Sequence, residues 1–146
     1  MPPTRFHSML ANLRSQGHRV TPQRLAVLRC LAESAEHPSV EDIYRAVKAD
    51  FPTTSLATVY KTVALLKALG EAMELGFSDS GNRYDGLRPY PHPHLVCTRC
   101  RKIVDPDLEG IADLTAELAR ESGFRILTQR MDFFGICPDC QKNASP

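Results

Sequence analysis

Residues 54–85 decide the fold, and they read TSLATVYKTVALLKALGEAMELGFSDSGNRYD. In the first half of this stretch, apolar side chains recur at the spacing of one helix face, which predicts a helix from about Thr54 to just before Gly70. The second half has two short extended runs around a Ser-Asp-Ser-Gly turn, which predicts a β-hairpin. A helix followed by a small hairpin indicates a winged-helix arrangement.

Three further helices are predicted before this stretch, and they cover residues 4–16, 21–35 and 39–50. Thr21 followed by Pro22 is an N-cap and first-turn pair, and Ser39 with Asp42 three residues later is a capping-box pattern. Residues 1–86 are therefore predicted to form an N-terminal winged helix-turn-helix domain.

The sequence changes character after the hairpin. Residues 86–94 read GLRPYPHPH, and their three prolines exclude a regular helix, so we expect a linker over residues 87–93. Beyond the linker, residues 94–105 predict strands around a turn, residues 108–123 an amphipathic helix, and residues 124–137 further strands. The predicted fold class is α+β, with a second, C-terminal α/β domain over residues 94–146.

Charge is distributed unevenly between the two halves of the chain. Residues 1–70 contain nine basic and five acidic side chains, and residues 71–146 contain nine and twelve, so the formal charges are +4 and −3. The first acidic residue is Glu33. This asymmetry suits a first half that binds a polyanion, although a solvated basic helix face would explain the charge equally well.

The helix predicted from Thr54 has two distinct faces. Its apolar stripe consists of Leu56, Val59, Val63 and Leu66. Its opposite face carries Ser55, Thr58, Lys61 and Thr62, with Tyr60 at the flank. Small polar, tyrosine and lysine side chains suit a helix that reads the DNA major groove, whereas periodicity alone fits any solvated amphipathic helix. The basic N-terminal segment and the following hairpin favour the DNA-binding interpretation.

Four of the five cysteines form two C-x2-C pairs, Cys97 with Cys100 and Cys137 with Cys140. Two intervening residues let both thiolates of a pair point at one tetrahedral ion, and four thiolates leave that ion no open position. We therefore predict a structural zinc site. A disulfide framework would need a secreted protein, and a redox C-x-x-C would need only one copy. The fifth cysteine, Cys30, is predicted to be a buried, inert thiol.

Three histidines and two aspartates form a second candidate ligand set, consisting of His37, Asp85, His92, His94 and Asp105. His92 and His94 form H-x-H, and alternate residues of an extended segment share a face. Such a set of imidazoles and carboxylates would suit iron(II) or manganese(II). Taken alone the signal is weak, because histidines in linkers are often solvated.

Four motifs together resemble the ferric uptake regulator family. They are TPQR at 21–24, AEHPSVEDIY at 35–44, ATVYKTVALL at 57–66 and HPHLVCTRC at 92–100. The resemblance covers about residues 13–140. It implies an N-terminal winged-helix domain, a C-terminal α/β dimerisation domain, and a homodimer that binds a palindromic operator in double-stranded DNA when metal is bound.

Within the family, the chain is most similar to the peroxide-responsive repressors. The ligands of that branch match His37, Asp85, His92, His94 and Asp105. Iron-uptake regulators usually have glutamate at the two aspartate positions and H-H-x-H where this chain has P-H-P-H, so both differences favour the peroxide branch. Pro91 and Pro93 depart from the familiar pattern.

By resemblance, peroxide would oxidise His37 or His92 to 2-oxo-histidine when iron is bound, and manganese would leave the repressor insensitive to peroxide. We expect Ser55, Ala57, Thr58 and Tyr60 to lie near base edges, Lys61 and Arg24 near phosphates, and Arg19 near the minor groove.

Three alternatives remain at this point. An iron-uptake or zinc-uptake regulator would differ only in what it senses. A zinc hydrolase is not favoured, because the chain has no H-E-x-x-H motif. A zinc deaminase is not favoured either, because its H-x-E motif needs a glutamate two residues after the histidine, and His37 is followed by Pro38 and Ser39. A zinc-containing scaffold would have no DNA affinity. We expect a regulator that is not an enzyme. We also expect it to be cytoplasmic, since no apolar run reaches the roughly 18 residues of a membrane span and MPPTRFHSML lacks a signal-peptide core.

Overall fold

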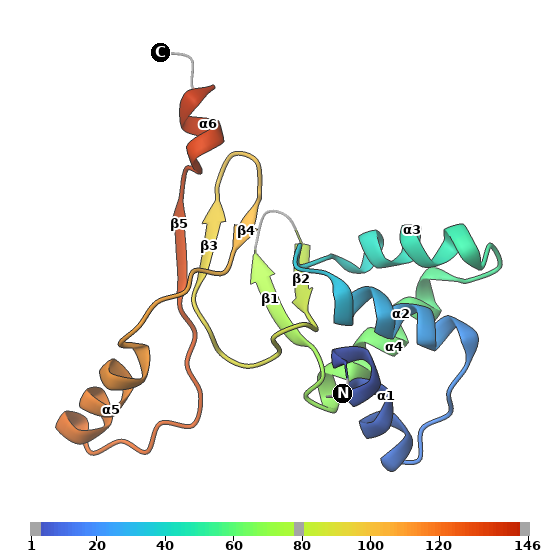
Figure 1. The fold of residues 1–146 in the computed structure, drawn as a ribbon, viewed down its shortest axis with the longest axis horizontal. Coiled ribbons are helices and arrows are strands. Elements are labelled where there is room, and N and C mark those ends of the chain that lie inside the picture. Colours follow the sequence, from blue (N-terminus) through green and yellow to red (C-terminus); the bar gives the residue numbers. More distant parts are fainter. Residues whose placement is uncertain (1–3, 78–80, 144–146) are drawn as a thin grey trace. The chain divides into compact units, whose positions relative to one another are not determined.

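The structure is a computed structural model that describes residues 4–77 and 81–143. It divides the chain into two compact units, residues 1–90 and residues 91–146 (Figure 1). The division falls within the segment predicted as a linker, residues 87–93.

The first unit begins with four helices. They are α1 (Arg5–Ser15), α2 (Pro22–Glu33), α3 (Val40–Asp50) and α4 (Leu56–Ala68). Each has a hydroxyl N-cap, from Thr4, Thr21, Ser39 and Ser55, whose side-chain oxygen accepts a hydrogen bond from a backbone N–H of the first turn. At α3 the predicted capping box is complete, because the Asp42 carboxylate also accepts from the Ser39 N–H. The predicted helix starts are therefore confirmed.

Apolar faces of these helices meet in one core, in which Leu13, Leu28, Ile43 and Leu66 are fully buried. The prediction for two positions of α4 was wrong. Leu56 is 38% exposed, because it lies in the first turn of the helix. Thr62 is 1% exposed, and its hydroxyl donates to the Thr58 carbonyl at 2.9 Å, so its polar atom is satisfied within the helix.

The predicted hairpin is present as β1 (Met73–Phe77) and β2 (Gly81–Asp85), which pair antiparallel. Of the residues predicted to make its turn, 78–81, residues 78–80 lie outside the described residues and Gly81 begins β2. The hairpin is joined to the helices through the α2–α3 loop. Ser39 and Arg83 form an isolated β-bridge, and the Tyr84 N–H donates to the Pro38 carbonyl at 3.0 Å. This pairing brings the end of β2 to the start of α3.

The second unit contains a three-stranded sheet and two helices. Its elements are β3 (His94–Cys97), β4 (Ile103–Val104), α5 (Ile111–Ser122), β5 (Asp132–Gly135) and α6 (Pro138–Lys142). The strand order is β4-β3-β5, with β3 antiparallel to β4 and parallel to β5.

Two expectations for the second unit were wrong. Residues 124–131 were predicted as strand, but within the described chain they have no strand partner and only residues 132–135 pair with β3. The short helix α6 was not predicted; it begins after Cys137 with Pro138 in its first turn, a position that proline favours.

The second unit buries few of its own apolar side chains. No residue of α5 is buried. Its exposed large apolar side chains include Leu114, Leu118, Phe124, Leu127, Phe133 and Phe134, and Leu127 is 80% exposed. Within residues 4–77 and 81–143, no helix is long and apolar enough to span a membrane.

Gly86 follows β2 and packs directly against α2. A substitution at Gly86 therefore tests how closely the hairpin end packs on the helices of the first unit. A Cβ at this position would lie 2.7 Å from the Leu31 Cβ and 2.9 Å from the Leu31 carbonyl oxygen. Because a backbone atom cannot move aside cheaply, Gly86→Ala is expected to lower the free energy of unfolding by about 1–3 kcal/mol. Urea denaturation followed by far-UV circular dichroism, at matched zinc content, measures this change.

The matched control is Gly76→Ala, since a Cβ there meets only the Asn82 Oδ1 at 3.4 Å, an ordinary contact. Equal urea midpoints for the two variants would contradict the close packing of Gly86 on α2.

Candidate metal centres

The four cysteines of the two C-x2-C pairs converge within the second unit. Cys97 ends β3, Cys100 lies in the turn that follows, and Cys137 and Cys140 flank the start of α6. Their four Sγ atoms all lie within 4.8 Å of one another. The Cys100 and Cys137 Sγ atoms are 3.7 Å apart, far longer than a disulfide bond of about 2.05 Å. Sulfurs around a tetrahedral zinc ion, with bonds of about 2.3 Å, are separated by roughly 3.8 Å.

The electrostatics of this cluster favour a bound cation. The backbone N–H groups of Cys137 and Cys100 point at the Cys97 Sγ, at 3.4 and 3.5 Å, and lower the pKa of Cys97 to about 5. The neighbouring Cys137 side chain, followed by burial, raises the pKa of Cys140 to about 12. Four adjacent thiolates therefore form together only when a cation balances their charge, and binding of that cation releases protons.

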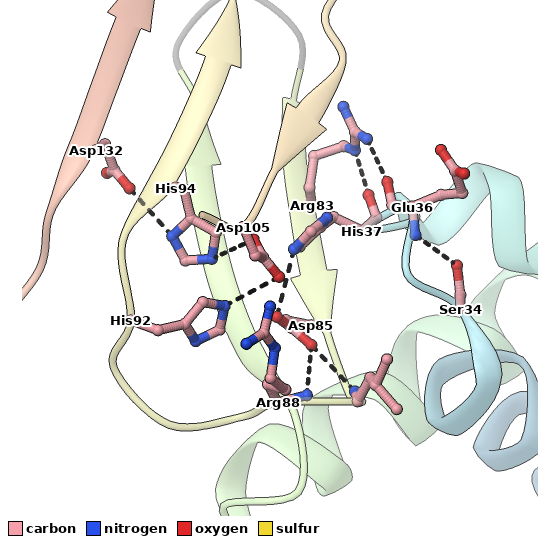
Figure 2. Close-up of polar contacts among 11 residues, drawn as sticks. Ser34, Glu36, His37, Arg83, Asp85, Arg88, His92, His94, Asp105 and Asp132 are labelled. Atoms are coloured by element: carbon pink, nitrogen blue, oxygen red, sulfur yellow. Dashed lines mark hydrogen bonds and ion pairs between the residues drawn. The ribbon is translucent and has the colours of Figure 1, made fainter. Parts of the chain in front are cut away.

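The first unit holds two of the five predicted histidine and aspartate ligands. His37 lies in the α2–α3 loop and Asp85 ends β2, and their Nε2 and Oδ2 atoms are 3.3 Å apart with both side chains 3% exposed. The Asp85 Oδ1 accepts from the backbone N–H groups of Leu87 at 3.0 Å and Arg88 at 2.8 Å (Figure 2). A buried imidazole and carboxylate are thus held face to face.

Arg83 fixes the loop that carries His37, a role that no motif in the sequence predicts. Figure 2 shows its guanidinium directed at two successive carbonyl oxygens; Nε donates to His37 and Nη2 to Glu36, the latter at 2.6 Å. His37 has a φ of 54°, in the left-handed region that non-glycine residues rarely adopt. Residues held in such conformations cluster at functional sites, where the surrounding contacts fix them.

The second unit holds the other three predicted ligands. His92 precedes β3, His94 begins it, and Asp105 follows β4. The Asp105 carboxylate faces both rings, with Oδ2 3.2 Å from the His92 Nε2 and Oδ1 3.6 Å from the His94 Nε2 (Figure 2). The antiparallel pairing of Leu95 with Val104 explains why Asp105 lies beside His94, because it places these two neighbouring residues opposite each other.

Most of the residues expected to contact DNA lie on the surface of the first unit. Ser55, Ala57, Tyr60 and Lys61 are exposed at the N-terminal end of α4, and Thr58 is half-buried. The Tyr60 hydroxyl donates to the Glu41 carboxylate at 3.0 Å, which raises the pKa of Tyr60. Arg19 is exposed, whereas the half-buried Arg24 donates to the Arg19 carbonyl at 2.6 Å.

The model of the ferric uptake regulator family matches residues 15–134, most of the chain. The chain belongs to the ferric uptake regulator family. It is therefore a metal-responsive transcription regulator of this family, and the family predicted from the motifs is confirmed.

Relatives within the ferric uptake regulator family include both branches considered above. The peroxide-responsive repressor PerR of Staphylococcus aureus (strain USA300) is 39% identical over 135 residues, which cover 90% of this chain and 88% of that protein. A structure of PerR from Streptococcus pyogenes, described as a basis for peroxide sensing and gene regulation, is 34% identical with a TM-score of 0.56 and covers 97% of this chain and 96% of its own.

The Helicobacter pylori ferric uptake regulator, whose structure is described as having three functional metal-binding sites, has a TM-score of 0.82 at 26% identity. The match covers 93% of each chain. These similarities confirm the predicted α+β fold class, with an N-terminal DNA-binding and a C-terminal dimerisation domain.

The cysteine cluster predicts that substitution of Cys97 affects zinc content and thermal stability, whereas substitution of Cys30 does not. Cys97→Ser is expected to lose stoichiometric zinc and to lower the thermal midpoint of the protein, since a structural zinc site contributes directly to folding. Zinc measured by inductively coupled plasma mass spectrometry, together with a thermal melt, tests this.

Cys30→Ser is the matched control, because Cys30 is half-buried on α2 in the first unit. It should keep both the zinc and the midpoint of the wild type. Full zinc content in Cys97→Ser would contradict a site made by the four thiolates.

Proposed function

We propose that this chain is a metal-dependent repressor that binds a palindromic operator as a homodimer and releases it when hydrogen peroxide oxidises a ligand histidine. Two groups of donors in a relative of PerR carry the proposal: His37 facing Asp85 in the first unit, and His92 and His94 facing Asp105 in the second. Both carboxylates of the set, Asp85 and Asp105, are aspartates, as the resemblance to the peroxide-responsive branch implies.

Zinc would be held by Cys97, Cys100, Cys137 and Cys140. The ion would connect the end of β3 to the start of α6 and so close a loop that contains β4, α5 and β5. Because four thiolates complete the coordination of zinc, no position is left for substrate or peroxide. This ion would serve the fold of the second unit rather than the regulation.

The regulatory metal ion would be shared between the two units. His37 and Asp85 of the first unit and His92, His94 and Asp105 of the second offer nitrogen and oxygen donors that suit iron(II) or manganese(II). An ion bound by both groups would select one orientation of the DNA-binding unit relative to the dimerisation unit. The ion would change the affinity for DNA because it would bind more tightly to the protein in that orientation than in the others.

A second copy of the chain would cover the apolar surface of the second unit. Side chains as exposed as Phe124 at 74% and Leu127 at 80% are typical of an interface rather than of a monomer surface. In the dimer, the orientation chosen by the metal would set the distance between the two α4 helices. That distance must match half-sites about one DNA turn, roughly 34–36 Å, apart or a multiple of it.

The DNA contacts would come from the N-terminal end of α4. Ser55, Ala57, Thr58 and Tyr60 would lie near base edges, Lys61 and Arg24 near phosphates, and Arg19 near the minor groove. The exposure of Tyr60 and Lys61 and the formal charge of +4 on residues 1–70 support this orientation. The Tyr60 hydroxyl would exchange its bond to Glu41 for one to DNA.

Iron(II), when bound, would supply the redox chemistry that cleaves the O–O bond of hydrogen peroxide next to the ligands, and the two electrons that peroxide gains would come, in the net reaction, from the oxidised histidine. The affected histidine, His37 or His92, would gain one oxygen atom at the carbon between its ring nitrogens, and the second oxygen of peroxide would leave as water. A 2-oxo-histidine is a poorer ligand than histidine, so the two units would no longer be held in one orientation. Manganese(II) would hold the same residues without supporting this oxidation.

Regulation of iron uptake is the second candidate function. It is favoured by the similarity to the Helicobacter pylori ferric uptake regulator, with its TM-score of 0.82. In that case iron would promote operator binding, and peroxide would leave the histidines unmodified.

The experiment is operator binding measured by fluorescence anisotropy with zinc-loaded protein and a palindromic duplex from its own promoter region. Iron(II), added without oxygen, and manganese(II) are each tested before and after dilute peroxide. Both metals should promote binding, and peroxide should release only the iron form, with one added oxygen on His37 or His92 by mass spectrometry. Asp105→Ala is the control that should not respond to either metal.

Release of the iron form without histidine oxidation would contradict the peroxide mechanism. Iron-dependent binding that peroxide does not change would support iron-uptake regulation instead. Equal DNA affinity with and without every metal would contradict both candidates.

A further inference from the structure

Asp132 is a largely shielded carboxylate of the second unit, with its side chain 12% exposed, and it does not belong to the five predicted ligands. It begins β5, and the parallel register pairs it directly with His94 at the start of β3. The His94 N–H donates to the Met131 carbonyl at 2.9 Å, which fixes this register at its first residue. Residues paired in register lie on the same face of a sheet, so backbone hydrogen bonds hold the two side chains next to each other.

The His94 ring lies between two carboxylates, one at each nitrogen. Its Nδ1 is 3.4 Å from the Asp132 Oδ1, and its Nε2 is 3.6 Å from the Asp105 Oδ1 (Figure 2). The three side chains are almost entirely shielded from water, with His94 2% exposed, Asp132 12% and Asp105 13%. The two carboxylates therefore face opposite edges of the same imidazole.

Arg130 holds the other oxygen of Asp132. Its Nε lies 2.8 Å from the Asp132 Oδ2, and its side chain is 54% exposed. Both carboxylate oxygens of Asp132 are therefore directed at protein groups, Oδ2 at Arg130 and Oδ1 at His94. This arrangement favours a role for Asp132 in orienting His94 over a role as a sixth metal ligand.

We propose that Asp132 is a positioning residue for the regulatory metal ion, an inference that rests on the function proposed above. With its Oδ1 3.4 Å from the His94 Nδ1, Asp132 would hold the proton on that nitrogen and so direct the lone pair of Nε2 toward Asp105 and the ion. A carboxylate behind a ligand histidine fixes the tautomer and orientation of the ring and strengthens its binding to metal. Asp132 thereby sets the affinity of the regulatory site without touching the ion.

The neighbouring Arg130 allows a sharp test. In Asp132→Asn, Arg130 takes the amide oxygen, so the amide NH2 faces the His94 Nδ1 and favours the wrong tautomer. Manganese(II) affinity should then fall about 10- to 100-fold. In the double variant Arg130→Met with Asp132→Asn, the amide can turn its oxygen to His94, and the affinity should recover in large part.

The measurement is titration of the zinc-loaded full chain with manganese(II), followed by the electron paramagnetic resonance signal of free manganese. Asp113→Ala, which removes an exposed carboxylate from α5, is the matched control and should bind as the wild type does. Zinc content and thermal midpoint should be unchanged in every variant, since a loss of fold would lower both.

Wild-type affinity in Asp132→Asn, within twofold, would overturn the proposal, as would a double variant no better than the single one. Asp105→Ala separates this failure from that of the proposed function. If Asp105→Ala loses manganese while Asp132→Asn does not, only the role of Asp132 is wrong. If Asp105→Ala binds manganese as the wild type does, the ligand set itself is wrong.

Discussion

Backbone pairing between strands positions the candidate ligands in both units. The bridge between Ser39 and Arg83 brings the end of β2, and with it Asp85, to the loop that carries His37. In the second unit, the pairing of β3 with β4 accounts for the approach of His94 to Asp105. Because backbone hydrogen bonds set these positions, each group of donors is arranged before a metal ion binds. The binding energy of the ion is then available to select an orientation between the units, as we propose.

The two ligand types divide the metal chemistry. Four cysteine sulfurs lie together within the second unit, where a zinc ion would be fully coordinated and chemically inert. The histidines and aspartates supply nitrogen and oxygen donors, which suit an exchangeable or redox-active ion. The signal that such a protein senses would then depend on the histidine and aspartate ligands, and on the Asp132, Arg130 and Arg83 side chains that position them.

Local signals in the sequence predicted the helices, the hairpin strands and the cysteine pairs, because hydroxyl caps, periodicity and C-x2-C spacing act over a few residues. Long-range contacts could not be predicted in this way. The role of Asp132 depends on a parallel register between segments about 40 residues apart, and that of Arg83 on a bridge to a loop. Residues 124–131 resembled a strand in composition but have no partner strand within the described chain.

The proposed regulation requires that one metal ion fixes the two units in a single orientation. Single-molecule energy transfer can measure this orientation, with dyes attached through non-natural amino acids at the exposed positions Asp50 and Glu121 of one protomer. Adding manganese(II) to the zinc-loaded protein should convert a broad distribution of transfer efficiencies into one narrow peak, and Asp105→Ala should stay broad. A wild-type distribution that does not change while manganese binds would show that the ion does not fix the orientation of the two units.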